Sequence, residues 1–170
     1  MNNILEIKNY LKDVDNNPFF FIGDASETLR QIPDSCVDCC ITSPPYWGQR
    51  SYENGGIGLE SNAIDFVENL LKITQEIKRV LKPTGSFWLN LGDTYQNKSL
   101  VGIPWRTALK MTDEQGWTLR NSIIWNKHKG GMDSANDRLR NVHENIFHFV
   151  KSSKGYYYND DAIRSNPRQT

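Results

Sequence analysis

The chain has 170 residues, of which 38% are hydrophobic and 11% aromatic, which is enough to bury one core and excludes a disordered or fibrous protein. No run approaches the roughly 18 apolar residues of a membrane span, and residues 1–15 lack a signal-peptide core, so we expect a cytoplasmic protein without a membrane partner. Twenty basic and twenty acidic residues cancel, which excludes a global field that would attract nucleic acid.

The first elements predict a strand, a turn and a helix. After a helix near the N-terminus, the apolar run 19–22 ends at Gly23-Asp24, and Ser26 opens a helical stretch that reaches Ile32. A second apolar run ends at Thr42 without strict alternation, as in a parallel strand covered on both faces. The prolines of Ser43-Pro44-Pro45-Tyr46 then force the chain out of the sheet at its carboxyl edge.

Three cysteines, Cys36, Cys39 and Cys40, lie around this second strand. Their number is odd, and they have no second pair at zinc-ligand spacing, which argues against a disulfide framework or a metal site. We interpret them as small buried side chains. His128, His143 and His148 are also too dispersed for a helical metal pair, so we expect no metal.

The middle of the chain continues the alternation of strands and helices. Residues 49–58 resemble a surface loop, and apolar residues from Ala63 to Leu81 recur at helical spacing. A strand over residues 86–91 ends at Gly92-Asp93, and Pro104 marks the start of another helix. Three alternations predict a doubly wound parallel sheet.

The last elements break this pattern. Trp117, Leu119, Ile123 and Trp125 are spaced for one face of a strand, although core packing explains Trp125, like Trp88, better than a functional role. Residues 146–150 form a further strand with no helix between. We therefore predict an antiparallel pair at the end of the sheet.

Polar signals follow three strands, at Gly23-Asp24, at the 43–46 turn and at Gly92-Asp93. Ligands of open α/β sheets bind at the carboxyl ends of strands, so these segments should converge. Turn formation alone explains a single Gly-Asp at least as often as ligand contact does. The 43–46 turn is more specific, because its prolines leave carbonyls free beside a hydroxyl and an aromatic ring.

This turn suits an exocyclic amine. Acceptors at Ser43 and the Pro44 carbonyl can hold both amine hydrogens and turn the lone pair toward a methyl donor, while Tyr46 stacks on the base. Because a duplex hides the amine, the nucleotide has to be flipped out, at a cost of a few kcal/mol that stacking helps to offset.

At this point a family can be named. Thr42-Ser43-Pro44-Pro45-Tyr46 resembles the catalytic motif of the amino-methyltransferases of bacterial restriction-modification systems, in the form commonest among cytosine-N4 enzymes. Four further blocks resemble the family's in its order: Phe21-Ile22-Gly23-Asp24-Ala25, Leu81-Lys82-Pro83-Thr84-Gly85, Leu89-Asn90-Leu91-Gly92-Asp93 and His143-Glu144-Asn145-Ile146-Phe147. Five ordered blocks are far more specific than one.

The resemblance implies an enzyme that transfers a methyl group from S-adenosylmethionine to cytosine N4 in double-stranded DNA. It implies catalytic roles for Ser43, Pro44, Pro45 and Tyr46, and contacts of Gly23, Asp24 and Ala25 with the cofactor, Asp24 at its adenine end. Trp47, Gln49 and Arg50, which follow the turn directly, would line the DNA path. Adenine-N6 methylation is the close alternative.

The resemblance also exposes an absence. In the circularly permuted members of this family, a glycine-rich loop of the type Asp-Pro-Phe-x-Gly-x-Gly and a ribose-binding acid lie near the C-terminus, and this sequence contains neither. The two strands of that segment would lie between the strands ending at Asp24 and Thr42. We therefore expect an incomplete Rossmann-like α/β sheet with a terminal antiparallel hairpin, completed by a second polypeptide or belonging to a fragment of a longer enzyme.

We expect residues 1–154 to form the catalytic subdomain and residues 155–170 to begin a target-recognition region or a C-terminal tail. Two alternatives stay open: a self-sufficient fold whose first strand pairs elsewhere, and a noncatalytic DNA-binding scaffold. The net charge is −4 up to Trp105, from 9 basic and 13 acidic residues, and +4 from Arg106 onward, from 11 and 7. A weakly basic face for phosphates and a randomly charged surface both explain this asymmetry.

Overall fold

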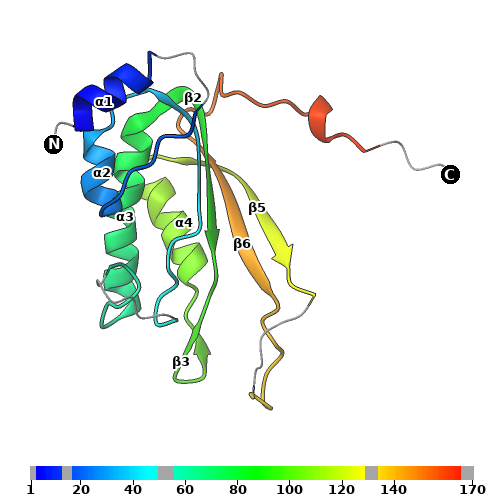
Figure 1. The fold of residues 1–170 in the computed structure, drawn as a ribbon. Helices are drawn as coiled ribbons and strands as arrows, with labels where there is room; N and C mark the ends of the chain where they lie inside the picture. The colour runs from blue at the N-terminus through cyan, green and yellow to red at the C-terminus, as the bar shows by residue number, and fades with distance from the viewer. Residues whose placement is uncertain (1–2, 13–16, 50–55, 129–133, 166–170) are drawn as a thin grey trace.

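The computed structural model describes residues 3–12, 17–49, 56–128 and 134–165 (Figure 1). In chain order its elements are α1 (Asn3–Tyr10), α2 (Ala25–Gln31), β1 (Val37–Thr42), α3 (Ala63–Val80), β2 (Leu81–Leu91), β3 (Tyr95–Gln96), β4 (Ser99–Leu100), α4 (Ile103–Asp113), β5 (Thr118–Asn126), β6 (His143–Val150) and the 3₁₀ helix η1 (Asp161–Ile163). Apart from the short hairpin of β3 and β4, the 3₁₀ helix η1, and the strand expected at residues 19–22, these elements are those that the sequence predicts.

One mixed sheet with the order β1-β2-β6-β5 forms the centre of the fold. β1 pairs with β2 in parallel, whereas β6 runs antiparallel to both of its neighbours, β2 and β5. The predicted terminal antiparallel pair is therefore confirmed. Its strand β6 lies inside the sheet, and β5 forms the edge.

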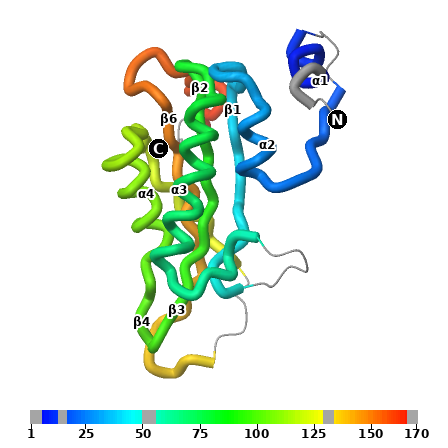
Figure 2. The backbone as a smooth tube through the Cα atoms, turned by 90° about the vertical axis from the view of Figure 1, so that its left-hand side faces the viewer, coloured from blue at the N-terminus to red at the C-terminus, as the bar shows by residue number. Residues whose placement is uncertain are grey.

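The helices α2, α3 and α4 lie on the same face of this sheet, as the two views in Figures 1 and 2 show. The doubly wound parallel sheet that the alternation predicts is thus wrong for the described residues, which form one helical layer on a sheet with a single parallel pair. Its opposite face carries β-strand side chains without a helix over them. Within the described ranges, no helix is long and apolar enough to cross a membrane.

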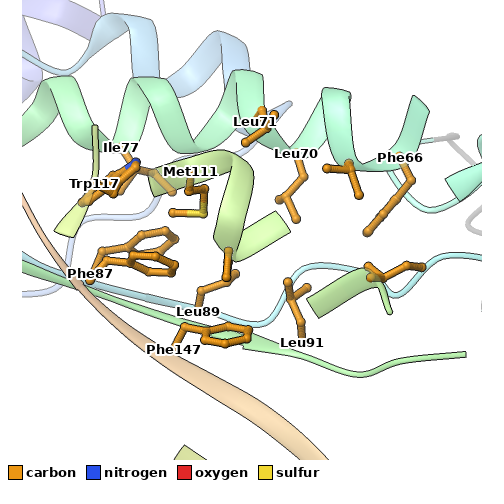
Figure 3. Close-up of a cluster of buried hydrophobic side chains, with 14 of the residues drawn as sticks. Phe66, Leu70, Leu71, Ile77, Phe87, Leu89, Leu91, Met111, Trp117 and Phe147 are labelled. Carbon is orange, nitrogen blue, oxygen red and sulfur yellow. The ribbon is translucent and has the colours of Figure 1, made fainter. Parts of the chain in front are cut away.

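The core lies between the sheet and these helices (Figure 3). β2 alternates strictly, so that Phe87, Leu89 and Leu91 are fully buried toward the helices while Ser86, Trp88 and Asn90 face the other side. α3 supplies Phe66, Leu70 and Ile77 at helical spacing. Burying each such side chain stabilises the fold by roughly 1.5–3 kcal/mol, so this layer fixes the register of β2.

The strand expected at residues 19–22 does not form. The segment is extended and pairs with no strand among the described residues, and the side chains of Phe20 and Ile22 are 80% and 100% exposed. An apolar segment becomes a strand only when a neighbour accepts its backbone hydrogen bonds. None of the described residues supplies such a neighbour to residues 19–22.

The expectation that Trp117, Leu119, Ile123 and Trp125 share one face of a strand is also wrong. A register shift between Leu119 and Asn121 reverses the alternation. Trp117 is therefore buried in the core, whereas Trp125 faces away from the helices and is 56% exposed. Cys39, expected inside, is exposed on the same helix-free face, because no second layer covers it.

The segment after β6 returns across this helix-free face. The rings of Trp88 and His148 stack at 4.1 Å between centroids, and Tyr156 and Tyr158 pack against His148. The Tyr157 backbone nitrogen donates a hydrogen bond to the Thr84 carbonyl at 2.9 Å. Residues 156–158 thus contact the main sheet directly, and a boundary after residue 154 stays a prediction.

Candidate active site

The 43–46 turn leaves the carboxyl end of β1 beside the end of β2. Hydrogen bonds to residues 58–60 hold this turn in place. Gly48 N donates to Gly58 O at 2.9 Å, and the Trp47 indole nitrogen donates to Glu60 O at 2.8 Å. Glu60 in turn accepts from Gly58 N at 2.8 Å and from the Asn69 side chain of α3 at 3.0 Å. The position of the turn therefore depends on these hydrogen bonds to α3 as well as on the rigidity of its two prolines.

The Tyr46 ring lies against the backbone of Gly92. A β-carbon at position 92 would be 2.6 Å from Tyr46 Cε2, closer than any side chain permits. Gly92 has ordinary backbone angles here, so what this glycine provides is space and not conformational freedom. The Gly92-Asp93 turn after β2 therefore contributes to the site through this contact.

Three side chains converge on the Tyr46 hydroxyl. Asn90 Nδ2 donates to the Tyr46 oxygen at 3.1 Å and to Ser43 Oγ at 3.4 Å, while Ser43 donates to the same tyrosine oxygen at 3.3 Å. Asn90 Nδ2 also donates to Glu144 Oε2 of β6 at 2.9 Å. We call Ser43, Tyr46, Asn90 and Glu144 the amide-hydroxyl cluster.

Charge enters this cluster through Glu144. Its carboxylate forms an ion pair with Lys127, just after β5, and its side chain is 12% exposed. Burial alone would raise the pKa of Glu144, but hydrogen bonds from Lys127, Asn90 and Tyr46 outweigh burial and lower that pKa. Burial raises the pKa of Tyr46, and the neighbouring Glu144 raises it further. Glu144 is thus ionised and Tyr46 protonated at neutral pH.

Within the described residues, no hydrogen-bond donor is paired with the Pro44 carbonyl, and the Ser43 side chain is exposed. The turn therefore offers two oxygen atoms that can accept hydrogen bonds from a ligand, next to a protonated aromatic side chain. The predicted residues Ser43, Pro44, Pro45 and Tyr46 do lie together at the carboxyl edge of the sheet.

Trp47 and Gln49, which follow the turn, differ in their exposure to solvent. Trp47 is packed in the core, and its indole nitrogen donates to Glu60 O, so a contact of this residue with DNA stays a prediction. Gln49 is exposed, and its backbone nitrogen donates to Tyr46 O at 3.2 Å. Arg50 lies outside the described residues.

Gly23, Asp24 and Ala25 lie at the start of α2, in the helical layer, whereas the amide-hydroxyl cluster lies at the sheet. Asp24 Oδ1 accepts from Ser26 N at 2.9 Å and Glu27 N at 3.1 Å, so this carboxylate caps the helix. Asp93 has a similar use: it accepts from Gly102 N and Ile103 N at the start of α4. Asp24 and Asp93 thus both have a structural role as helix caps.

Asn90 and Glu144 were not singled out by the sequence. Both lie in blocks that resemble the family's, but nothing in a one-dimensional pattern shows that β6 inserts next to β2 and brings Glu144 to the turn. The pairing Asn90↔Ile146 places them on adjacent strands. Among the described residues, no group of three or more His, Cys, Asp and Glu side chains could hold a metal ion.

Comparison with known proteins decides the family. Residues 37–170 match the DNA methylase family of N6 and N4 amino-methyltransferases, which covers the turn, the amide-hydroxyl cluster and every strand of the main sheet. The chain belongs to this DNA methylase family. Enzymes of the family depend on S-adenosylmethionine, as the resemblance implied.

The type II methyltransferases M.SmaI of Serratia marcescens and M.Cfr9I of Citrobacter freundii are 36% and 38% identical over 84% and 88% of this chain. This chain spans 59% of the length of each.

Solved structures share the fold. The cytosine-N4-specific PvuII DNA methyltransferase has a TM-score of 0.66 at 24% identity, over 80% of this chain and 49% of its own. The DNA modification methylase TTHA0409 of Thermus thermophilus, complexed with S-adenosyl-L-methionine, has a TM-score of 0.62 at 25% identity, over 81% and 54%. The predicted methyltransferase-like α/β fold is confirmed by this likeness.

Proposed function

We propose that this chain carries the catalytic part of a site-specific DNA methyltransferase that transfers a methyl group from S-adenosylmethionine to the N4 amine of cytosine in duplex DNA. The observation that carries the proposal is the amide-hydroxyl cluster: Ser43 and Tyr46 are held together at the carboxyl edge by Asn90. A scaffold without catalysis has no need of such an arrangement.

The chain's own residues hold and orient the amine. Ser43 Oγ and the Pro44 carbonyl accept its two hydrogens, which turns the nitrogen lone pair out of the plane of the base. The cofactor supplies an electrophilic methyl group on sulfur, which the nitrogen lone pair attacks while the carbon-sulfur bond breaks. The proton that the amine then loses passes to solvent or to a turn oxygen.

Tyr46 supports a base that has left the duplex. Gly92 lies against its ring near Cε2 and Cδ2, and we propose that a face of the ring stacks on the flipped base. Stacking of this kind contributes about 1–3 kcal/mol, which offsets part of the few kcal/mol needed to unstack a nucleotide. Gln49 and Arg50 are proposed to contact the strand from which the base has left.

The described residues fit only one end of S-adenosylmethionine. Asp24 caps α2 through Oδ1, which leaves Oδ2 to accept from the adenine amine, beside Gly23 and Ala25. We propose that the methionine and ribose ends are held by a glycine-rich segment outside this sequence, on a complementary subunit or on another part of a longer, circularly permuted enzyme. The free edge of β1 and the exposed segment at residues 17–22 support this.

We propose that residues 155–170 lead into a target-recognition region. We also propose a cytoplasmic location, where the enzyme would meet chromosomal DNA. Neither proposal depends on the identity of the methylated base.

The direct test is incubation of the chain, with and without a polypeptide that carries the glycine-rich segment, with tritiated S-adenosylmethionine and duplex DNA. Mass spectrometry of the digested nucleosides then separates N4-methylcytosine from N6-methyladenine. We expect N4-methylcytosine. Label in N6-methyladenine would move the assignment to the family's other substrate, and label in RNA or protein alone would refute the DNA substrate.

A further inference from the structure

We infer that Glu144, held by Lys127, is a positioning residue that fixes the direction of the hydrogen bonds in the amide-hydroxyl cluster, so that Ser43 presents a lone pair to the substrate amine. This inference rests on the proposed function, because it concerns how the same site holds its substrate. It assigns a role to two residues that lie outside the 43–46 turn.

The first step is the orientation of the Asn90 amide. A carboxylate can only accept hydrogen bonds, and the ion pair with Lys127 keeps Glu144 ionised. Glu144 Oε2 lies 2.9 Å from Asn90, so it has to meet the amide nitrogen and not the amide oxygen. Bonds of this kind to a charged acceptor are about twice as strong as neutral ones.

The Asn90 oxygen shows what this orientation costs. Asn90 Oδ1 is buried and has no hydrogen-bond partner among the described residues. A buried unpaired acceptor is unfavourable, so the amide is not oriented for the benefit of its oxygen. The charged bond to Glu144 offsets that cost and imposes the orientation.

The second step concerns the two hydroxyls. With its nitrogen toward the turn, Asn90 donates to the Tyr46 oxygen at 3.1 Å, and Ser43 donates its proton to the same oxygen at 3.3 Å. The tyrosine proton is drawn toward Glu144, to which Tyr46 is also hydrogen-bonded. The Ser43 proton is thus directed into the cluster, and the exposed Ser43 hydroxyl keeps a lone pair for the substrate amine.

The consequence is chemical. If Ser43 turned its proton into the site, that proton would hydrogen-bond the amine lone pair, which is the pair that has to attack the methyl group. Without a charged acceptor at position 144, the Asn90 amide and both hydroxyls are free to reverse. Glu144 therefore raises the reaction rate by excluding this unproductive arrangement, and it need not touch the substrate.

The test compares Glu144→Gln with the matched control Glu68→Gln in the full chain. Glu68 also forms an ion pair with a lysine, Lys110, but joins α3 to α4 away from the cluster. The first measurement needs no activity: the ultraviolet titration of Tyr46, taken as the difference between each protein and its Tyr46→Phe partner. Because Glu144 raises the pKa of Tyr46, Glu144→Gln should lower that pKa, and Glu68→Gln should leave it unchanged.

The second measurement is steady-state methylation of duplex DNA under the conditions in which the wild type is active. Glu144→Gln should lower kcat about ten- to a hundredfold, the range for losing a hydrogen bond to a charged group, and leave the KM for DNA nearly unchanged. Glu68→Gln should keep both constants. A wild-type kcat for Glu144→Gln, or an unchanged Tyr46 titration, overturns the inference while the proposed function stands.

Two further results separate the possibilities. If the wild type never methylates DNA but Glu144→Gln still shifts the Tyr46 titration, the proposed function fails and the hydrogen-bond arrangement is supported. If circular dichroism shows that Glu144→Gln is unfolded, Lys127→Met replaces it, because this variant keeps the carboxylate and removes the cation that holds it. Wild-type behaviour of Lys127→Met in both measurements would then overturn the role of the pair.

Discussion

The Tyr46 ring occupies space that Gly92 leaves open: a β-carbon at position 92 would lie 2.6 Å from Tyr46 Cε2. Gly92→Ala should therefore displace the ring and weaken the hydrogen bond between Asn90 and the Tyr46 hydroxyl. Overpacking of this size costs roughly 1–3 kcal/mol of stability. We expect a lower thermal midpoint and a larger fall in methylation rate than in DNA affinity. Gly155→Ala, which has no atom near the new β-carbon but a φ of +75°, is a control that should lower stability through backbone strain while leaving the methylation rate unchanged. A wild-type thermal midpoint and methylation rate for Gly92→Ala would show that the ring contact is unimportant.

Ser43→Ala and Tyr46→Ala distinguish an enzyme from a scaffold. Each removes a member of the amide-hydroxyl cluster, so each should lower kcat by at least about tenfold. The measurement is methylation by the chain together with any polypeptide it needs for activity. Unchanged rates in both variants would favour the scaffold, since the chain would then not supply the amine-binding turn.

Asp93 has a structural role, and its removal should show in stability. Its carboxylate accepts from Gly102 N at 3.0 Å and Ile103 N at 3.1 Å, and α4 has no side-chain cap of its own. Asp93→Ala should lower the free energy of unfolding by about 1–2 kcal/mol. Asp137→Ala, which removes an exposed ion pair with Lys98, should change it by less than about 1 kcal/mol. Chemical denaturation of both variants checks this, and similar midpoints for the two would contradict it.

The ion pair at the cluster predicts a pH dependence of stability. Hydrogen bonds from Lys127, Asn90 and Tyr46 lower the pKa of Glu144 below its ordinary value of 4.5, despite the opposing effect of burial. A lowered carboxyl pKa stabilises the fold above the ordinary value, and this contribution is lost as the pH falls through the folded pKa. The difference in thermal midpoint between wild type and Glu144→Gln should be largest near neutral pH and shrink below about pH 4. A difference that is independent of pH would mean that the charge of Glu144 is not stabilising.

We expect the isolated chain to bind S-adenosylmethionine weakly. In the proposed function, Asp24 and the 43–46 turn contact the cofactor, whereas the loop for the methionine and the acid for the ribose are proposed to lie outside this sequence. Losing charged hydrogen-bond partners costs on the order of 1.5–3 kcal/mol each, so two or three losses lower affinity about a thousandfold or more. Isothermal titration should show little heat for the chain alone and normal binding after addition of a polypeptide with the glycine-rich loop. Micromolar binding by the chain alone would show that the cofactor pocket is placed wrongly.

Local sequence signals determined most of the elements. The apolar spacing from Phe66 to Ile77 fixes α3, because one apolar stripe at helical period has to be buried, and the two prolines after Ser43 end β1 at the turn. The five motif blocks likewise identified the family, since each block depends on short-range chemistry.

The features that depend on strand order and register could be seen only in the tertiary structure. Residues 19–22 have the composition of a strand but pair with no strand among the described residues, and one irregularity in β5 moves Trp125 out of the core. The insertion of β6 beside β2 brings Glu144 to within 2.9 Å of Asn90, although 54 residues separate them in the chain. Pairing between distant strands depends on the whole sheet, so a local pattern predicted the 43–46 turn but not the carboxylate that orients it.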